Sequence, residues 1–270
     1  MTLSTDRLIH SIEEKYPPAL QEEYDNCGWQ IDLRRDDTES VLVALEVTGR
    51  VIDEAKELGV GLILTHHPLV FMPLRRIDTG AGDPVGEYVV RLINAGIGVY
   101  SAHTSFDAAE DGMNDALARA FGLSDVKGFP LRGSGASSIG RSGMLEPPLP
   151  FGEVIARAEQ HFGMRGRLKT IGDPARMIRK VALCGGGAGE YVLSAVQEGM
   201  DLYITADLRH HEAQFARERG LALIDGGHWG TEKIFVSVMC GFLQHAFGDS
   251  LRIIASQVSA DPYLPWGEDD

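Results

Sequence analysis

Cysteine is scarce in this chain. The 270 residues include three cysteines, Cys27, Cys184 and Cys240, which lie far apart and are odd in number. They form neither a disulfide framework nor a Cys-x-x-Cys metal-binding motif, so we interpret them as small apolar residues in a reducing compartment. Any metal ion that this chain binds is therefore expected to have histidines and carboxylates as ligands.

Positive charge is also in deficit. The chain has 25 Lys and Arg against 39 Asp and Glu, for a formal net charge of −14. This balance disfavours non-specific binding to nucleic acid or an anionic membrane, although a local basic pocket could still bind a phosphorylated small molecule. No apolar run approaches the length of a membrane-spanning helix, and the N-terminus lacks a basic segment followed by an apolar one. We expect a cytoplasmic protein without nucleic-acid or membrane partners.

Motifs of covalent catalysis are missing. There is no Gly-x-Ser-x-Gly elbow and no cysteine beside a local histidine, which disfavours a serine or cysteine nucleophile. A glycine-rich run at 185–189 follows a predicted strand but lacks the Lys-Ser/Thr of a P-loop and the full dinucleotide fingerprint. Two interpretations of this run stay open, an anion cradle made of backbone amides at a helix N-terminus and a tight strand-to-helix turn.

Short apolar runs alternate with amphipathic stretches along most of the chain. Continuous apolar strands between helices are typical of a sheet covered on both faces, so we predict an α/β fold. The predicted strands are 41–45, 62–64, 97–101, 181–184, 202–205, 221–224 and 251–256. The predicted helices are 50–58, 83–95, 114–121, 151–162, 191–198, 211–219 and about 231–245.

The segment 128–179 interrupts this alternation. It contains a Gly/Ser-rich run at 133–138 and a turn-rich run, Glu146-Pro147-Pro148-Leu149-Pro150. Because 151–162 has the pattern of an amphipathic helix, we interpret the segment as the start of a second lobe rather than a disordered linker. The last residues, 266–270, are expected to form a solvated tail.

Three groups of possible metal ligands follow predicted strands. His66 and His67 come directly after strand 62–64, at the edge where open α/β sheets bind ligands. His103 and Asp107 follow strand 97–101. A third group follows strand 221–224, where His228 and Glu232 are four residues apart at a helix start and so share one face.

Together these groups offer six candidates: His66, His67, His103, Asp107, His228 and Glu232. Imidazoles with a few carboxylates suit zinc, iron or manganese better than calcium or magnesium. One catalytic zinc usually takes three protein ligands, whereas six candidates fit two ions roughly 3.5–4 Å apart, bridged by carboxylates and a hydroxide. Asp107 and Glu232 are the natural bridging candidates.

Each group has a plainer explanation when it is taken alone. A single His-His pair at a strand end is more often structural or on the surface, and a His/Glu pair four apart is usually a surface helix pair. Three such groups in one chain make separate plain explanations much less probable. His210-His211 also follows a strand, but it lies at a predicted helix start, where a surface role or a contact behind the ligands is preferred.

Several motifs, in the same order, resemble the NIF-three-like dinuclear-metal-centre family, the type 2 GTP cyclohydrolase homologues. They are Asp25-Asn26-Cys27-Gly28-Trp29-Gln30, Thr65-His66-His67-Pro68, Ser101-Ala102-His103-Thr104 with Asp107, Cys184-Gly185-Gly186-Gly187, Ile204-Thr205-Ala206-Asp207, and Asp225-Gly226-Gly227-His228 with Thr231-Glu232. Two positions depart from the family's pattern, since Glu46 stands where Asp is more common and Ala206 stands where Gly is more common.

The resemblance implies a set of site residues and an assembly. The metal ligands would be His66, His67, Asp107, His228 and Glu232. His103 would lie beside the metals, either as an acid/base group or as a residue that contacts the ligands without binding the metals. Two divalent transition-metal ions, of iron, zinc or manganese, would lie in a cleft between two α/β lobes. The chain would assemble into a toroidal homo-hexamer.

The lobes are predicted to be discontinuous in sequence. The first would comprise 1–127 with 229–270, because the third ligand group must return to the metals held by the first half. The second would comprise 128–228.

Two functions from different classes compete. The first is a dinuclear metal-dependent hydrolase that acts through a metal-bridging hydroxide. The resemblance alone implies its substrate, a purine nucleotide. The second is a metal chaperone or a metal-dependent adaptor without catalysis. A purely structural metal site ranks third, because ligands at strand ends usually border a cleft.

Overall fold

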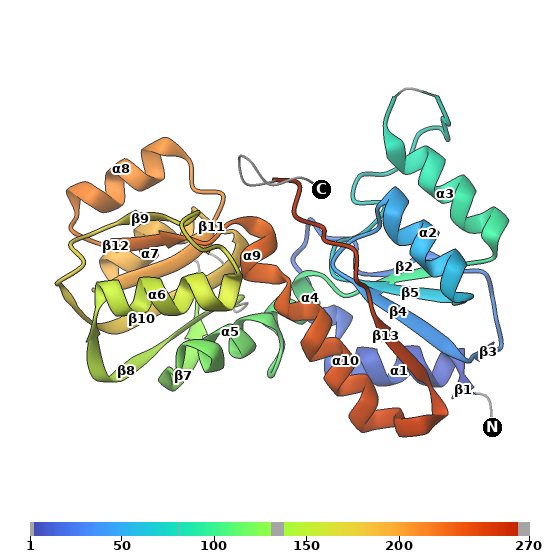
Figure 1. Cartoon of the computed structure of the whole chain (residues 1–270), viewed down its shortest axis with the longest axis horizontal. Coiled ribbons are helices and arrows are strands. Elements are labelled where there is room, and N and C mark those ends of the chain that lie inside the picture. The colour runs from blue at the N-terminus through green and yellow to red at the C-terminus, as the bar shows by residue number, and fades with distance from the viewer. Residues whose placement is uncertain (1–2, 81, 131–137, 264–270) are drawn as a thin grey trace. The chain divides into compact units, whose positions relative to one another are not determined.

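The computed structural model describes residues 3–80, 82–130 and 138–263, and it divides the chain into two compact units. The first unit comprises Met1–Ala109 and Phe235–Asp270, and the second comprises Glu110–Ile234. Figure 1 shows that each unit is built around its own sheet. The predicted Gly/Ser-rich loop at 133–138 falls largely, and the predicted tail at 266–270 wholly, outside the described residues.

The first unit contains a mixed five-stranded sheet in the order β13-β4-β5-β6-β2. Neighbours from β13 to β6 pair in parallel, and β2 pairs with β6 antiparallel. Its strands are β2 (Gly28–Ile31), β4 (Ser40–Ala44), β5 (Leu62–Thr65), β6 (Gly98–Ser101) and β13 (Arg252–Ala255), and a two-stranded ribbon adds β1 (Leu3–Ser4) and β3 (Asp37–Thr38). Every residue of β4, β5 and β6 is buried, which explains their continuous apolar character.

Helices cover both faces of this sheet. They are α1 (Thr5–Lys15), α2 (Gly49–Leu58), α3 (Pro84–Ala95), α4 (Thr104–Ala108) and α10 (Ile234–Phe247). Figure 1 shows α2 and α3 on one face of the sheet and α1 and α10 on the other. Helix α2 begins where the Thr48 side chain accepts a hydrogen bond from Val51 N, and it ends at Gly59, whose left-handed backbone (φ 68°) favours glycine.

The second unit contains a mixed six-stranded sheet in the order β7-β8-β10-β11-β12-β9. Its central pairs β10–β11 and β11–β12 are parallel, and the outer pairs are antiparallel. The strands are β7 (Ser124–Phe129), β8 (Gly140–Pro150), β9 (Lys169–Ile171), β10 (Met177–Gly187), β11 (Leu202–Ala206) and β12 (Ala222–Asp225). The helices are α5 (Met113–Phe121), α6 (Phe151–Phe162), α7 (Tyr191–Gln197), α8 (His210–Glu218) and α9 (His228–Glu232).

The predicted α/β class is confirmed, with two mixed sheets flanked by helices. Two details of the prediction were wrong. The proline-rich run 146–150 is the end of strand β8 rather than a turn, and the predicted helix at about 231–245 is two helices, α9 and α10. No helix in the described part of the chain is long and apolar enough to cross a membrane.

The boundaries of the compact units differ from those predicted for the lobes. Helix α5 and residues 229–234 belong to the second unit, because α5 packs on β8 and β10 and α9 packs on β10 and β11. As a consequence His228 and Glu232 are held by the second unit, whereas His66, His67, His103 and Asp107 are held by the first.

Candidate metal centre

The adjacent histidines follow β5 in the first unit, and hydrogen bonds hold the backbone of both. The amides of His66 and His67 both donate to the carbonyl of Leu45, at 3.0 Å each. The His66 side chain is completely buried, and its Nδ1 lies 3.0 Å from the carbonyl oxygen of Ala102. Because a carbonyl can only accept, Nδ1 carries the proton and Nε2 carries the lone pair that can bind a metal.

The lone pair of His66 is directed to the neighbourhood of a carboxylate. His66 Nε2 lies 3.6 Å from Oδ1 of Asp107, which belongs to the short helix α4 after β6. The partner histidine is held less closely, since His67 Nδ1 lies 3.5 Å from Oε2 of Glu46. Glu46 is one of the two positions noted above at which the sequence departs from the motifs that it resembles, and its carboxylate lies close to this imidazole.

His103 stands at the start of α4 and is held by a carboxylate from a distant part of the chain. Its Nδ1 lies 2.8 Å from Oδ1 of Asp25, so Nδ1 donates and Nε2 carries the lone pair. The other oxygen of Asp25 accepts from the amide and the hydroxyl of Thr104. Burial raises the pKa of Asp25, but these hydrogen bonds and the His103 charge outweigh it, so its pKa lies well below the ordinary value.

These three histidines form one cluster within the first unit. The ring centroid of His66 lies 5.1 Å from that of His67 and 5.0 Å from that of His103. One ring nitrogen from each of the three can be chosen so that all lie within 4.8 Å of one another, a spacing at which a metal ion could be held. Within this unit the structure brings together histidines that follow two neighbouring strands, β5 and β6.

The second unit contributes a histidine and a carboxylate from one short helix. His228 and Glu232 are the first and last residues of α9, and His228 Nε2 lies 3.0 Å from Oε2 of Glu232. His228 Nδ1 lies 2.7 Å from Oδ2 of Asp207, which again assigns the proton to Nδ1. Asp207 adopts a positive φ of 52°, an uncommon backbone conformation for a residue other than glycine.

The glycine-rich run at the end of β10 makes room for this pair. A Cβ atom on Gly186 would overlap Oε1 of Glu232, and the residue has φ 69°, so only glycine fits here without strain. The amides of Gly185 and Gly186 already donate to the side chains of Asn114 and Thr231, at 2.8 and 3.0 Å. These two amides are engaged within the protein, which favours the interpretation of the run as a tight turn over that of an anion cradle.

The residues present fit transition-metal ions. Two ligands on one tetrahedral zinc ion with bonds near 2.1 Å lie about 3.4 Å apart, and two cis ligands of an octahedral ion lie about 3.0 Å apart. The His66–Asp107 and His228–Glu232 separations, 3.6 and 3.0 Å, are close to these values. In His66, His103 and His228 the Nδ1 atom is bonded to a carbonyl or a carboxylate, as is usual for metal-binding histidines.

Comparison with known proteins places the chain in a family. Residues 3–262 match the model of Duf34/NIF3 (NGG1p interacting factor 3). The chain belongs to this family. It is 32% identical over 268 residues to a "GTP cyclohydrolase 1 type 2 homolog" of Clostridium acetobutylicum, covering 97% of this chain and 99% of that protein.

Two further relatives span similar lengths. A "Protein NIF3 homolog" of Schizosaccharomyces pombe is 32% identical over 275 residues, with 96% of each chain covered. Among solved structures, a Bacillus cereus protein related to NIF3 superposes with a TM-score of 0.88 at 25% identity, covering 98% of this chain and 99% of that one. The NIF3 fold therefore extends over both units.

Residue-level reasoning on the sequence missed the groups that orient the histidines of this NIF3 family member. Asp25 and Asp207 lie in the motifs that carried the family resemblance, but their roles could not be read from those motifs. The partner of each is remote, 78 residues away for Asp25 and 21 residues away for Asp207. A signal was nevertheless present, because both aspartates stand inside the motifs that carried the family resemblance.

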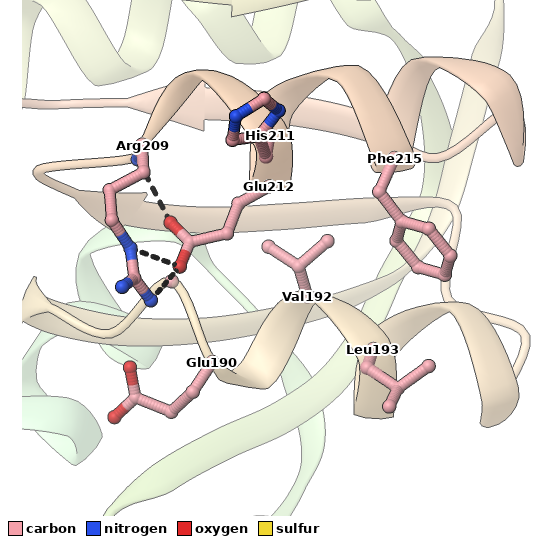
Figure 2. Close-up of a pocket in the computed structure, with 8 residues that line it drawn as sticks. Glu190, Val192, Leu193, Arg209, His211, Glu212 and Phe215 are labelled. Atoms are coloured by element: carbon pink, nitrogen blue, oxygen red, sulfur yellow. Dashed lines mark hydrogen bonds and ion pairs between the residues drawn. The ribbon is translucent and has the colours of Figure 1, made fainter.

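A separate pocket of about 360 Å³ lies in the second unit between α7 and α8, and Figure 2 shows its lining. Val192, Leu193 and Phe215 form apolar walls, and the Glu212 carboxylate is bound by the Arg209 guanidinium. His211 lines the pocket and His210 begins α8, and both are exposed. Neither residue belongs to the His/Glu clusters of the described chain.

Proposed function

We propose that this NIF3 protein is a metal-dependent hydrolase that binds two divalent transition-metal ions, of iron, zinc or manganese. The proposed ligands are His66, His67, Asp107, His228 and Glu232. The observation that carries the proposal is the repeated anchoring of Nδ1 in His66, His103 and His228. Such anchoring fixes the tautomer that a metal ligand or a proton-transfer group requires.

Both groups of ligands have the same task in this proposal, which is to hold the metal ions. When bound, the ions would supply Lewis acidity and would lower the pKa of a coordinated water towards neutrality. His66 and Asp107 would orient the ions from the first unit, and Glu232 from the second. Neither group alone offers enough ligands for two four-coordinate ions, so the proposal requires both.

His103 is proposed as the acid/base group. Asp25 holds its Nδ1 proton, stays ionised because its pKa is strongly lowered, and stabilises the imidazolium that forms when Nε2 takes up a proton. The proton-transfer atom is therefore Nε2 of His103. The proposed substrate is a purine nucleotide, a choice supported by the name of the clostridial relative, a "GTP cyclohydrolase 1 type 2 homolog".

The test is hydrolysis by metal-loaded protein. We expect the wild type to open the purine ring of GTP, followed by its ultraviolet spectrum. His103→Ala should retain its metal and lose about 10²–10⁴-fold in rate, whereas Glu232→Ala should lose metal as well. His245→Ala, an exposed histidine of α10, is the matched control and should be unchanged. Absence of turnover of any purine nucleotide by metal-loaded wild type would overturn the proposal.

A second candidate is a metal chaperone or metal-dependent adaptor, and one observation favours it. The side chains of His228 and its anchor Asp207 are 42% and 58% exposed, as expected for a ligand that exchanges its metal. Transfer of metal from loaded protein to a chelator within seconds, with no hydrolysis, would support this function. Retention for hours with turnover would support the hydrolase.

The assembly and the partners also remain proposals. We propose a homo-hexamer that acts on a small molecule and binds neither nucleic acid nor membrane, on the strength of the family resemblance and the net charge of −14. Light scattering at micromolar concentration should give six times the chain's 29.4 kDa. A monomer at this concentration would contradict the proposed assembly.

A further inference from the structure

The loop that follows the adjacent histidines is anchored at its beginning by the Asp-Asn-x-Gly-x-Gln motif. Val70 lies three residues after His67, and its carbonyl accepts from Asn26 Nδ2 at 2.6 Å. Its amide donates to Gln30 Oε1 at 3.1 Å. Because Asp25 of the same motif holds His103, one short segment positions both His103 and the beginning of this loop.

The same loop is anchored at its end. The backbone of Asp78 packs so closely on Gly86 of α3 that a Cβ atom there would overlap the Asp78 carbonyl oxygen. Asp78 Oδ1 also accepts from the amide of Gly80 at 2.9 Å. The residues between these anchors, 71–77, are held at both ends, and we refer to them as the 71–77 loop.

The side chains of the 71–77 loop are exposed although several are strongly apolar. Phe71, Met72 and Ile77 are 44%, 71% and 57% exposed. Apolar side chains grouped on an anchored loop contribute little to the core, and such groups commonly mark a binding surface. Within the described residues, this is the longest run of the chain in which large exposed apolar side chains recur.

Two features indicate what this surface binds. The Phe71 ring stands at 88° to the His103 ring with centroids 6.1 Å apart, so a partly exposed aromatic ring lies beside the proposed acid/base. Arg75 and Arg76 are consecutive and exposed in a chain with a net charge of −14. Among the described residues Arg75 has no acidic partner, and Arg76 has only Asp78 at 4.0 Å. Arginine binds phosphate in a bidentate fashion, and an aromatic ring stacks on a planar base.

We infer that the 71–77 loop is the recognition surface for a phosphorylated compound with a planar ring, in which Phe71 stacks on the ring and Arg75 and Arg76 bind the phosphate. This inference rests on the proposed function, because it assigns the loop to the substrate of the site that contains His103. The nearness of Phe71 to His103 favours a small-molecule ligand over a second copy of the chain.

The experiment measures equilibrium binding of GMP, guanosine and inorganic phosphate to metal-loaded protein by calorimetry. Phe71→Ala should weaken GMP and guanosine alike by about tenfold or more, because both carry the ring. Arg75→Ala and Arg76→Ala should each weaken GMP by about tenfold and leave guanosine unchanged, with a smaller dependence on salt. Arg7→Ala, which removes an exposed charge on α1, is the matched control.

The outcomes separate this inference from the proposed function. Loop variants that bind GMP as tightly as the wild type, or a wild type that binds neither GMP nor guanosine, would overturn the inference. If the variants instead change the mass in solution and leave GMP affinity unchanged, the loop is a subunit interface and the inference is wrong. GMP binding that depends on the loop, without hydrolysis, would uphold the inference and contradict the proposed hydrolase. Hydrolysis with a KM that is unchanged in the loop variants would support the hydrolase and contradict the inference.

Discussion

The two units hold their imidazoles in different ways. In the first unit His66 is fully buried and bonded to a backbone carbonyl, and His103 is bonded to the buried carboxylate of Asp25. In the second unit His228 is 42% exposed and bonded to Asp207, itself exposed and in an uncommon backbone conformation. The first group is therefore preorganised by the core of its sheet, and the second depends on one loop residue and on the space beside Gly186.

The largest difference between the units should appear when each imidazole is removed. His66→Ala should lower the free energy of unfolding of metal-free protein by about 2–4 kcal/mol, because it leaves a cavity and an unpaired buried carbonyl. His228→Ala should lower the free energy of unfolding by less than about 1 kcal/mol, because the His228 side chain is partly exposed. Urea denaturation of chelator-treated protein measures both. Equal losses would show that the two imidazoles are supported alike.

A second prediction concerns Gly186. Gly186→Ala should abolish metal binding by the second unit's ligands, because the added Cβ must displace the Glu232 carboxylate, and φ 69° adds a strain of about 1 kcal/mol. Gly199→Ala is the matched control, since it has φ 65° with nothing within 4 Å of the added Cβ. Metal content and thermal stability report the two effects separately. If Gly186→Ala keeps its metal and loses only as much stability as Gly199→Ala, then the close fit of Gly186 against the Glu232 carboxylate does not matter for metal binding, contrary to this prediction.

The buried carboxylate of the first unit should make stability depend on pH. The pKa of Asp25 is lowered in the folded state, so the ionised group stabilises the fold above its unfolded pKa of about 4, and this stabilisation is lost as the pH falls through the lower folded value. The Tm of metal-free Asp25→Asn should lie below that of the wild type at pH 7, and the gap should narrow towards pH 3. A gap that stays constant over this range would refute the assignment.

The smallest effect is expected for the histidine pair outside the proposed centre. His210 and His211 begin α8 and are exposed, and neither belongs to the clusters in the described chain that could hold a metal. The double substitution His210→Ala, His211→Ala should leave metal content unchanged and alter stability by less than about 0.5 kcal/mol. Loss of metal in this variant would mean that the second unit's ligands extend beyond α9.

The parallel strands of both units could be predicted because they are buried on both faces and read as unbroken apolar runs, as in β4, β5 and β11. Strand β8 could not, because its prolines resemble turn signals. Only its first part pairs with β7 as well as β10, whereas Leu149 and Pro150 pair with β10 alone beyond a register shift. Proline has no amide hydrogen to donate, so a strand tolerates it where no neighbouring strand pairs on one of its sides.

The candidate ligands could be found from the sequence because they stand at strand ends, which local patterns locate. Their anchors could not, since the His103–Asp25 and His228–Asp207 bonds join residues that are close only after folding. The role of Gly186 was equally hidden, because the glycine run fitted two explanations until Glu232 was placed against it.

The most direct test of the account is metal content per chain, measured by mass spectrometry on protein purified without chelator or affinity nickel. We expect about two transition-metal ions per chain in the wild type and clear losses in both His66→Ala and Glu232→Ala, one variant from each unit. His245→Ala should keep both ions. A wild type that cannot be loaded with iron, zinc or manganese would contradict the metal centre, as would full metal content in Glu232→Ala.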